Sequence, residues 1–375
     1  MPRLYGAATV AAMPGIEVWT LKEGAQPAET TAARLIEFLG AAKRTLDLAL
    51  YDIRLPDAVG DSIGDALRGA KERGVEVRLL YNTDRPRPIP VPPPPGTRPE
   101  LIEALPFPTR DIPGEPDLMH HKYVVRDGEA VWTGSMNWTT DAWTLQENVV
   151  VLVSSPEVAA AFSVNFEELW EKRKVERSGH VDPVAISVGD ATVRAWFCPG
   201  RGKALSHRIA GAIDRAERVR IASPVITSGP ILGTLAQVIS DGHSDVAGVV
   251  DAPQIEQVLK QWDDNGHSEW KYPLLARVVG DGRFTGKRST PYRPGAIHDY
   301  MHAKITVADS TVFVGSFNLS RSGEMNAENV LEIEDAELAG RMSAYIDEIR
   351  AGFPPLPLPR ELTPGPAPGR SSRRN

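Results

Sequence analysis

The sequence contains HHKYVVRDGEAVWTGSMN at residues 120–137 and a near copy, HAKITVADSTVFVGSFN, at residues 302–318. Each copy has a histidine two positions before a lysine, an aspartate five positions after that lysine, and then Gly-Ser-x-Asn. Ten positions past each asparagine comes a Glu-Asn pair, at Glu147-Asn148 and Glu328-Asn329. Each feature alone is common in unrelated proteins. Their joint repetition at matching spacing predicts a chain built from two related halves.

Each copy also has the pattern of a β-hairpin. The β-prone runs at 123–125 and 305–307 follow the histidine and lysine, and the pairs Asp127-Gly128 and Asp309-Ser310 predict tight turns. Because side chains alternate faces along a strand, a His-x-Lys pair places imidazole and ammonium on the same face of a sheet. The return strand ends at the Gly-Ser pair, so we expect the asparagine side chain to lie beside that face.

Outside the two copies, strand-like and helix-like segments alternate in the same order in both halves. The first half is expected to form strands at 16–19, 45–51 and 75–81 and helices at 30–43, 62–73 and 162–174. The second half is expected to form strands at 193–197, 218–224 and 246–251 and helices at 205–217 and 231–239. This alternation implies parallel strands with helices that cover the sheet.

A chain of 375 residues is long enough for two domains that each bury a core. We expect a first domain at 1–176, a linker at 177–190, a second domain at 191–353, and a disordered tail rich in Pro and Arg at 354–375. Long irregular stretches are expected at 84–116, which includes the proline run 92–95, and at 261–300, which is rich in aromatic residues. Both precede a His-x-Lys pair, where they can wall a site; disorder is the alternative for the proline run.

The composition indicates a globular protein of a reducing compartment. With 42% hydrophobic and 24% charged residues, it has no bias toward disorder. The single cysteine, Cys198, excludes an internal disulfide. No stretch resembles a signal-peptide core or a membrane span, so a cytoplasmic location is expected.

The net charge of −7 argues against a non-specific nucleic-acid binder, since such proteins are usually basic. Residues 271–304 are locally basic, with seven basic side chains (Lys271, Arg277, Arg283, Lys287, Arg288, Arg293, Lys304) against Asp281 and Asp299. This stretch predicts either an electropositive rim for an anionic substrate or a solvated basic loop.

The residue types in the two copies are those needed to break a phosphodiester without a metal. One imidazole can attack phosphorus and form a covalent phosphohistidine. A second, protonated imidazole can give a proton to the leaving oxygen, a role that typically contributes about 10²–10⁴-fold. Two ammonium groups and two amides can stabilise the non-bridging oxygens of the transition state. We therefore expect neither a metal nor a cofactor.

These motifs closely resemble the signature of the phospholipase D superfamily, a His-Lys-Asp motif followed by Gly-Ser-x-Asn. The resemblance covers both copies and, more loosely, residues 16–353. It implies an α/β fold of two similar phospholipase D-like domains, each with a mixed sheet flanked by helices and related by a pseudo-twofold axis. One active site is implied at their interface, with a His-Lys-Asn set from each domain. One chain then supplies the whole site, so no oligomer is required.

The resemblance also assigns roles to individual residues. His120 is implied to be the nucleophile, and His302 the general acid and then the base for water. The downstream carboxylates Glu147 and Glu328 are implied to orient the histidines. Phosphate binding is implied for two lysines and two asparagines, supported by two serines: Lys122, Lys304, Asn137, Asn318, Ser135 and Ser316.

Three other residues of the motifs are expected to have structural roles. Asp127 and Asp309 complete the catalytic motifs, but an aspartate at a hairpin turn is expected to be more structural than chemical. The second motif has one residue fewer between Asp309 and its glycine than the first, which predicts a shorter hairpin. His121 lies next to the implied nucleophile and is expected to point to the opposite face and pack there.

The superfamily includes lipases, nucleases and lipid synthases, so the resemblance does not select the substrate. The favoured function is phospholipase D-type hydrolysis, or transphosphatidylation, of a phospholipid headgroup, because two intact motifs lie in one chain and an aromatic loop can contact an acyl surface. The alternative is a nuclease for DNA or RNA, since the same aromatics alternate with basic residues that can bind a nucleic-acid backbone. A third option is a non-catalytic module that binds phosphate or nucleic acid.

Overall fold

The computed structural model describes residues 9–54, 58–83, 102, 104–280, 283–293 and 296–356. The first half contains β1 (Thr9–Met13), β2 (Ile16–Leu21), α1 (Ala28–Gly40), β3 (Thr45–Leu50), β4 (Ile53–Arg54), α2 (Ala58–Glu72), β5 (Glu76–Thr83), β6 (Thr109–Pro113), β7 (Lys122–Arg126), β8 (Ala130–Gly134), β9 (Trp138–Thr139), α4 (Thr140–Thr144), β10 (Asn148–Ser154) and α5 (Pro156–Lys172). The second half contains β11 (Ile186–Val188), β12 (Ala191–Phe197), α6 (Gly202–Arg215), β13 (Arg218–Ala222), α7 (Gly229–Asp241), β14 (Asp245–Asp251), α8 (Ala252–Asn265), α9 (Tyr272–Val279), β15 (Phe284–Lys287), β16 (Ile305–Ala308), β17 (Thr311–Gly315), α10 (Arg321–Met325), β18 (Asn329–Glu334) and α11 (Ala336–Ala351).

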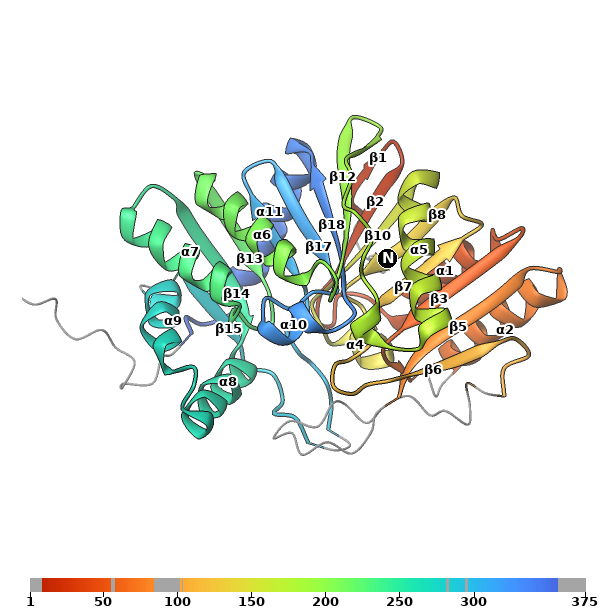
Figure 1. Cartoon of the computed structure of the whole chain (residues 1–375), viewed down its shortest axis with the longest axis horizontal. Coiled ribbons are helices and arrows are strands. Elements are labelled where there is room, and N and C mark those ends of the chain that lie inside the picture. The colour runs from red at the N-terminus through yellow and green to blue at the C-terminus, as the bar shows by residue number, and fades with distance from the viewer. Residues whose placement is uncertain are drawn as a thin grey trace, which may run out of the picture.

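Each half forms one eight-stranded sheet (Figure 1). The strand order is β1-β2-β10-β8-β7-β3-β5-β6 in the first sheet and β11-β12-β18-β17-β16-β13-β14-β15 in the second. The two orders match position by position, so that β7 corresponds to β16 and β10 to β18. This match confirms the predicted pair of similar α/β halves.

Both sheets are mixed, as predicted. β3 runs parallel to β5, and β13 runs parallel to β14, through the crossover helices α2 and α7. β7 and β8 form an antiparallel hairpin, as do β16 and β17, and these two hairpins carry the repeated motif. The central strands are buried on both faces and rich in β-branched residues, such as the run VVV in β10, which favour extended backbone.

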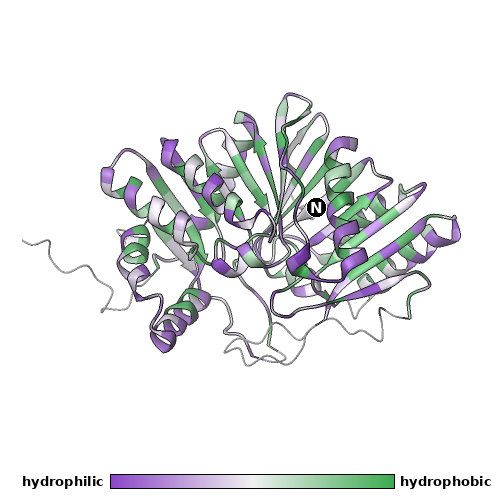
Figure 2. Ribbon diagram, in the orientation of Figure 1, coloured by the Kyte–Doolittle hydropathy of each residue, from purple (hydrophilic) through white to green (hydrophobic). Residues whose placement is uncertain are grey.

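Helices cover the outer faces of the sheets and also lie between them. α1 and α2 pack on the outer face of the first sheet, and α6, α7 and α9 on that of the second. α5 and α11 contribute to a central core that contains strand residues from both sheets. Figure 2 shows mostly hydrophobic strands and helices with hydrophilic outer faces. The two halves therefore meet through a shared core, as predicted for domains packed face to face.

The stretches predicted to be irregular contain regular elements. β6 lies within 84–116 and pairs with β5, while α9 and β15 lie within 261–300 and β15 pairs with β14. Both strands lie at sheet edges and are short, so their sequences lack the alternation that identifies a strand. The predicted linker at 177–190 includes β11, which joins the second sheet. The proline run lies outside the described residues.

The end of the second half extends slightly beyond its predicted boundary. The N–H of Gly286 donates to the carbonyl of Pro354, and the N–H of Leu356 donates to that of Phe284. The rest of the predicted tail, 357–375, lies outside the described residues. Within the part of the chain that the structure describes, every helix is too short or too polar to span a bilayer.

Candidate active site

The two His-x-Lys pairs lie where the two halves meet. The N–H of His120 donates to the carbonyl of Ala327 at 2.9 Å, and the N–H of His302 donates to the carbonyl of Glu147 at 3.1 Å. Both hydrogen bonds cross from one half to the other. Each half therefore fixes the backbone of the histidine that the other half supplies.

A cavity of about 780 Å³ lies over this junction, and its lining includes four motif residues, His120, His302, Asn137 and Asn318. Within the described residues, the side-chain oxygens of the two asparagines are buried and have no hydrogen-bond partner. A buried polar group without a partner is costly, so these amides are suited to contact a ligand. The structure thus brings together the histidines and asparagines that the sequence predicted.

Glu328 of the second half binds His120 of the first, where the resemblance implied only that Glu328 orients a histidine. A carboxylate oxygen of the fully buried Glu328 lies 2.8 Å from His120 Nδ1. Because a carboxylate accepts hydrogen bonds, Nδ1 carries the hydrogen and Nε2 keeps a lone pair. Burial, with the charges of Lys122 and Lys304, holds the pKa of His120 well below its usual value. This lowered pKa favours the unprotonated ring at neutral pH.

Asn148 takes the corresponding place beside His302. Its Oδ1 lies 3.1 Å from His302 Nδ1. Its amide nitrogen donates to Ala142 O at 2.9 Å and to Gln146 Oε1 at 3.2 Å, while Ser135 Oγ donates to Oδ1 at 2.7 Å. These contacts fix the amide orientation, so Oδ1 accepts the hydrogen of His302 Nδ1. His302 therefore also presents Nε2, but its partner is neutral.

The prediction that Glu147 orients a histidine is wrong. Gly134 pairs with Val150, two residues after Asn148, and Gly315 pairs with Val330, two residues after Glu328. Sheet register therefore makes Asn148, not Glu147, the structural counterpart of Glu328. Glu147 instead accepts a hydrogen bond from Lys287 Nζ at 2.8 Å. Both glutamates lie ten residues past a motif asparagine. The segment between the motif glycine and its paired residue is nevertheless one residue longer in the first half, where it contains α4, than in the second, where it contains α10.

The two motif lysines are buried beside the histidines. Lys122 Nζ donates to the carbonyl of His120 at 2.6 Å, and Lys304 Nζ donates to that of His302 at 2.8 Å. Burial lowers the pKa of Lys122 to about 7. Burial and then the charge of Lys122 lower the pKa of Lys304 well below its usual value. An anion between two buried cations favours their charged forms, so the pair is suited to bind one phosphate group.

The second histidine depends on the same charges. Burial, followed by the charges of Lys304, Lys122 and His120, holds the pKa of His302 well below its usual value. Burial raises the pKa of Glu328 to about 7, although the charge of Lys122 opposes this rise. A bound phosphate anion offsets the lysine charges and so raises the pKa of His302. Binding of a phosphate group would therefore favour the protonated form of His302.

The Gly-Ser pairs hold the hairpins close to the neighbouring strands. A Cβ atom on Gly134 or Gly315 would lie 2.1 Å from a carbonyl oxygen of the neighbouring strand, that of Val149 in β10 or of Asn329 in β18, so a side chain cannot fit. Ser135 and Ser316 follow and are fully buried. Ser135 Oγ binds Asn148, and Ser316 Oγ accepts a backbone N–H of β18 at 3.0 Å. The serines thus support the strands that carry the partners of the histidines.

Asp127 and Asp309 lie in the hairpin turns and do not line the cavity. Both have left-handed backbone angles, with φ of 57° and 48°, which aspartate adopts more readily than most residues. Their carboxylates accept backbone N–H groups at the start of the adjacent strand, from residues 43–45 and from residues 217–218. Their place in the catalytic set is therefore corrected: each attaches a turn to the neighbouring strand. The second motif is shorter because its turn has two residues, not three.

Replacing Asp127 with alanine is expected to lower the free energy of unfolding by about 3 kcal/mol, because three N–H groups lose their acceptor and alanine disfavours the left-handed backbone. Denaturant unfolding followed by circular dichroism measures the loss. Asp309→Ala is the matched control, with a smaller expected loss because that carboxylate accepts two N–H groups. A fall in kcat without a fall in stability would show that Asp127 has a chemical role.

The sequence did not identify Lys287 as a residue of the site, because Lys287 lies in the basic stretch that was predicted to form an electropositive rim. That prediction is wrong for Lys287, which is 3% exposed and binds Glu147 across the interface. Asn148 was also missed, although the repeated Glu-Asn pair contained the signal. His121 is fully buried beside Tyr123, with Nδ1 3.2 Å from Asn329 Oδ1, and does not line the cavity.

The aromatic stretch at 261–300 divides between the cavity and the core. Tyr292 and Tyr300 line the cavity on either side of His298, whose ring stacks on Tyr300 with centroids 5.4 Å apart. Trp262 and Phe284 are buried in the core of the second half instead. The prediction that this stretch walls the site is therefore confirmed for its C-terminal part.

The similarity to known proteins covers most of the chain and is not confined to the two motifs. The family model described as the phospholipase D-like (PLD-like) domain of cardiolipin synthase matches residues 35–170 and 207–350. The chain is 30% identical over 149 residues to the mitochondrial cardiolipin hydrolase of Chlamydomonas reinhardtii, and 30% identical over 163 residues to that of Homo sapiens. These alignments cover 39% and 42% of this chain and 60% of each relative. The chain thus spans about three fifths of the length of these curated relatives.

A solved structure supports the fold over almost the whole chain. Phosphatidylserine synthase of Haemophilus influenzae Rd KW20 is similar over 93% of this chain and 88% of that chain, with a TM-score of 0.60 and 13% sequence identity. Each of the two blocks matched by the family model contains one complete motif and the strand that follows it. The chain therefore belongs to the phospholipase D superfamily.

Proposed function

We propose that the protein is a phospholipase D-type phosphodiesterase that releases the headgroup of a phospholipid through a phosphohistidine. The observation that supports this most is that His120 and His302 line one cavity, each with Nδ1 bound by the other half. Two buried lysines beside them can neutralise one phosphate. Relatives named as cardiolipin hydrolases support a phospholipid substrate.

In the first step, His120 Nε2 attacks phosphorus, and a P–N bond forms as the bond from phosphorus to the headgroup oxygen breaks. His302, protonated on Nε2, gives that proton to the departing oxygen, so the headgroup leaves as an alcohol. The phosphorylated ring keeps its hydrogen on Nδ1 and is cationic. The Glu328 carboxylate, 2.8 Å from that nitrogen, stabilises the positive charge.

In the second step, a water molecule attacks the same phosphorus from the side that the headgroup has left. His302 Nε2 takes a proton from the water as the new P–O bond forms. The P–N bond breaks, its electron pair returns to His120 Nε2, and phosphatidate is released. His302 is then protonated for the next cycle. An alcohol in place of water gives transphosphatidylation by the same steps.

The unequal partners favour this assignment of roles. A carboxylate partner stabilises the cationic phosphohistidine, and His120 is the histidine that has one. A neutral amide partner leaves an imidazolium easier to deprotonate, and His302 is bound by Asn148. His120 therefore suits the nucleophile and His302 the acid.

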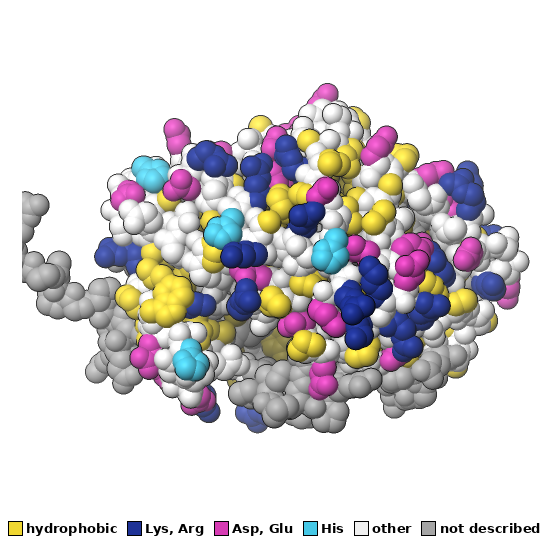
Figure 3. Space-filling view, viewed as in Figure 1, with side chains coloured by type: hydrophobic (Ala, Val, Ile, Leu, Met, Phe, Trp, Pro, Cys, Tyr) yellow, Lys and Arg dark blue, Asp and Glu magenta, His cyan; other side chains and the backbone are white. Residues whose placement is uncertain are grey.

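The charge of the cavity lining favours a phospholipid over a nucleic acid. Apart from the histidines, the charged residues of the described lining are Asp52, Asp117, Glu256 and Lys260. Binding of a nucleic-acid strand depends on contacts to several successive phosphates, and a mainly acidic lining opposes such contacts. On the face shown in Figure 3, basic and acidic side chains are both spread over the two halves.

The purified protein is expected to release headgroup alcohol and phosphatidate from vesicles of cardiolipin, phosphatidylcholine or phosphatidylethanolamine, and to form phosphatidylethanol when ethanol is added. Activity should persist in EDTA, because the two lysines supply the charge that a metal would otherwise supply. Loss of activity in EDTA that a divalent ion restores would contradict the metal-free mechanism. Cleavage of DNA or RNA without lipid turnover would indicate a nuclease, and phosphate binding without turnover of either would indicate a binding module.

A further inference from the structure

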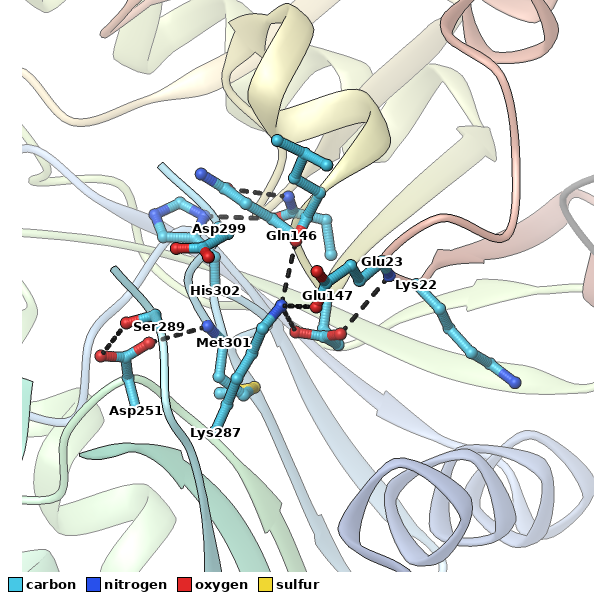
Figure 4. Close-up of polar contacts among 12 residues, drawn as sticks. Lys22, Glu23, Gln146, Glu147, Asp251, Lys287, Ser289, Asp299, Met301 and His302 are labelled. Carbon is cyan, nitrogen blue, oxygen red and sulfur yellow. Dashed lines mark hydrogen bonds and ion pairs between the residues drawn. The ribbon is translucent and has the colours of Figure 1, made fainter. Parts of the chain in front are cut away.

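The junction beside His302 contains a buried ion pair that crosses between the halves (Figure 4). Lys287, the last residue of β15, donates hydrogen bonds to Glu147 Oε2 at 2.8 Å and to Leu145 O at 3.0 Å, and its ammonium group forms an ion pair with Glu23 Oε2 at 3.0 Å. All three partners belong to the first half. Lys287 is thus a cation of the second half that is buried against the first and paired with two of its carboxylates.

The matching positions at the junction beside His120 are apolar. Asn82 in the first half and Asp251 in the second each accept the N–H of the residue before a motif histidine. In the sheets, Asn82 pairs with Ile112, and Asp251 pairs with Lys287. The residues whose carbonyls accept the histidine N–H groups are Ala327 and Glu147. One junction therefore has the buried pair Ile112 and Ala327 where the other has Lys287 and Glu147.

We propose that Lys287 is a positioning residue that keeps the Glu147 carboxylate away from His302 and so leaves Asn148 as the partner of that histidine. Lys287 binds the chain at Leu145 and Glu147, directly before Asn148. Glu147 also binds the backbone of His302, so it is adjacent to both. A buried carboxylate that loses its cation either takes up a proton or moves to another donor. His302 is such a donor, because its Nδ1 carries a hydrogen.

This arrangement makes the two half-sites chemically different. The charged or titratable groups that act on His302 are basic ones, Lys304, Lys122 and His120. The Asp251 carboxylate accepts the backbone N–H of Met301, the residue before His302, at 2.9 Å, and it also accepts the hydroxyl of Ser289. A carboxylate placed beside His302 would stabilise its imidazolium and weaken it as an acid. The inference rests on the proposed function only where it makes His302 the acid.

Two variants and one control test the proposal. Lys287→Ile removes the cation, and Lys287→Ile with Glu147→Ala reproduces the apolar pair of the other junction. The control is Lys271→Ile, which removes a lysine that donates to Thr227 O within the second half. The titration midpoint of His302 is read by NMR in each folded protein, with His302→Asn used to assign its signal, and the pH profile of kcat is measured with phospholipid vesicles.

The single variant is expected to raise the titration midpoint of His302, to move the alkaline limb of kcat upward, and to lower kcat about tenfold, since the proton donor is then weaker. The double variant should return all three to wild-type values, and Lys271→Ile should change none. Unchanged titration in the folded single variant would overturn the proposal, as would a double variant that is as impaired as the single one. If no substrate is turned over, the proposed function fails, while the NMR titration still tests the position of Glu147.

Discussion

Replacing His120 with asparagine is expected to lower kcat by about 10⁴- to 10⁶-fold, because the proposed covalent intermediate forms on the ring nitrogen that this change removes. Asparagine keeps a side-chain amide that can bind Glu328, so the fold should survive. Circular dichroism and denaturant unfolding check this point. A variant with near wild-type kcat would show that His120 is not the nucleophile.

His302→Asn should lose as much activity on a phospholipid, but for a different reason. The first step then lacks its proton donor, and the second lacks the base for water. With an activated substrate, such as a p-nitrophenyl phosphodiester, the leaving group needs no proton, so a burst of one product per enzyme is expected before turnover stops. His120→Asn should show no burst on that substrate. Equal bursts in both variants would contradict the separate roles.

Glu328→Gln is expected to lower kcat by about 10²- to 10³-fold, the loss typical when a group that stabilises charge in the transition state is removed. The glutamine can still accept the hydrogen of His120 Nδ1, but it does not neutralise the cationic phosphohistidine. Burial raises the pKa of Glu328 to about 7, so the same loss should develop in the wild type as the pH falls below 7. The pH profile of kcat measures this limb, which Glu328→Gln should abolish.

The matched control for this variant is Glu332→Gln, on β18, the strand that directly follows Glu328. Glu332 is fully buried and binds Trp196 Nε1 at 2.9 Å and Arg208 at 2.5 Å, away from the cavity lining. Its loss is expected to lower the free energy of unfolding by about 3–5 kcal/mol, because it leaves buried partners unpaired, and to leave kcat unchanged at permissive temperature. An equal loss of kcat in both variants would mean that Glu328 acts through stability.

The duplicated fold could be predicted because its signals are local and occur twice. Each hairpin is defined by β-branched runs around an Asp-containing turn, and the strand–helix order repeats in both halves. The edge strands β6 and β15 could not be predicted in this way, since they are held mainly by pairing with β5 and β14 and not by their own pattern. The face-to-face arrangement came from the resemblance to a family, because no spacing along the chain encodes a contact between distant sheets.

The candidate site was predictable in composition but not in its asymmetry. Spacing identified the histidines, lysines and asparagines, and it identified Glu328. It placed Glu147 in the equivalent role because both glutamates lie ten residues beyond an asparagine. The structure shifts the register by one residue and places Asn148 beside His302. The cause is one extra residue between Asn137 and the strand that pairs with its hairpin, which the equal spacing to the two Glu-Asn pairs does not reveal.

The most direct test of a single site with His120 as its nucleophile is to locate the covalent phosphorus. Wild-type enzyme and the two histidine variants are mixed with the activated phosphodiester, quenched in alkaline denaturant and digested, and the phosphorylated peptide is identified by mass spectrometry. We predict an adduct on His120 in the wild type, its accumulation in His302→Asn, and its absence in His120→Asn. An adduct on His302, or turnover without any phosphohistidine, would contradict the account.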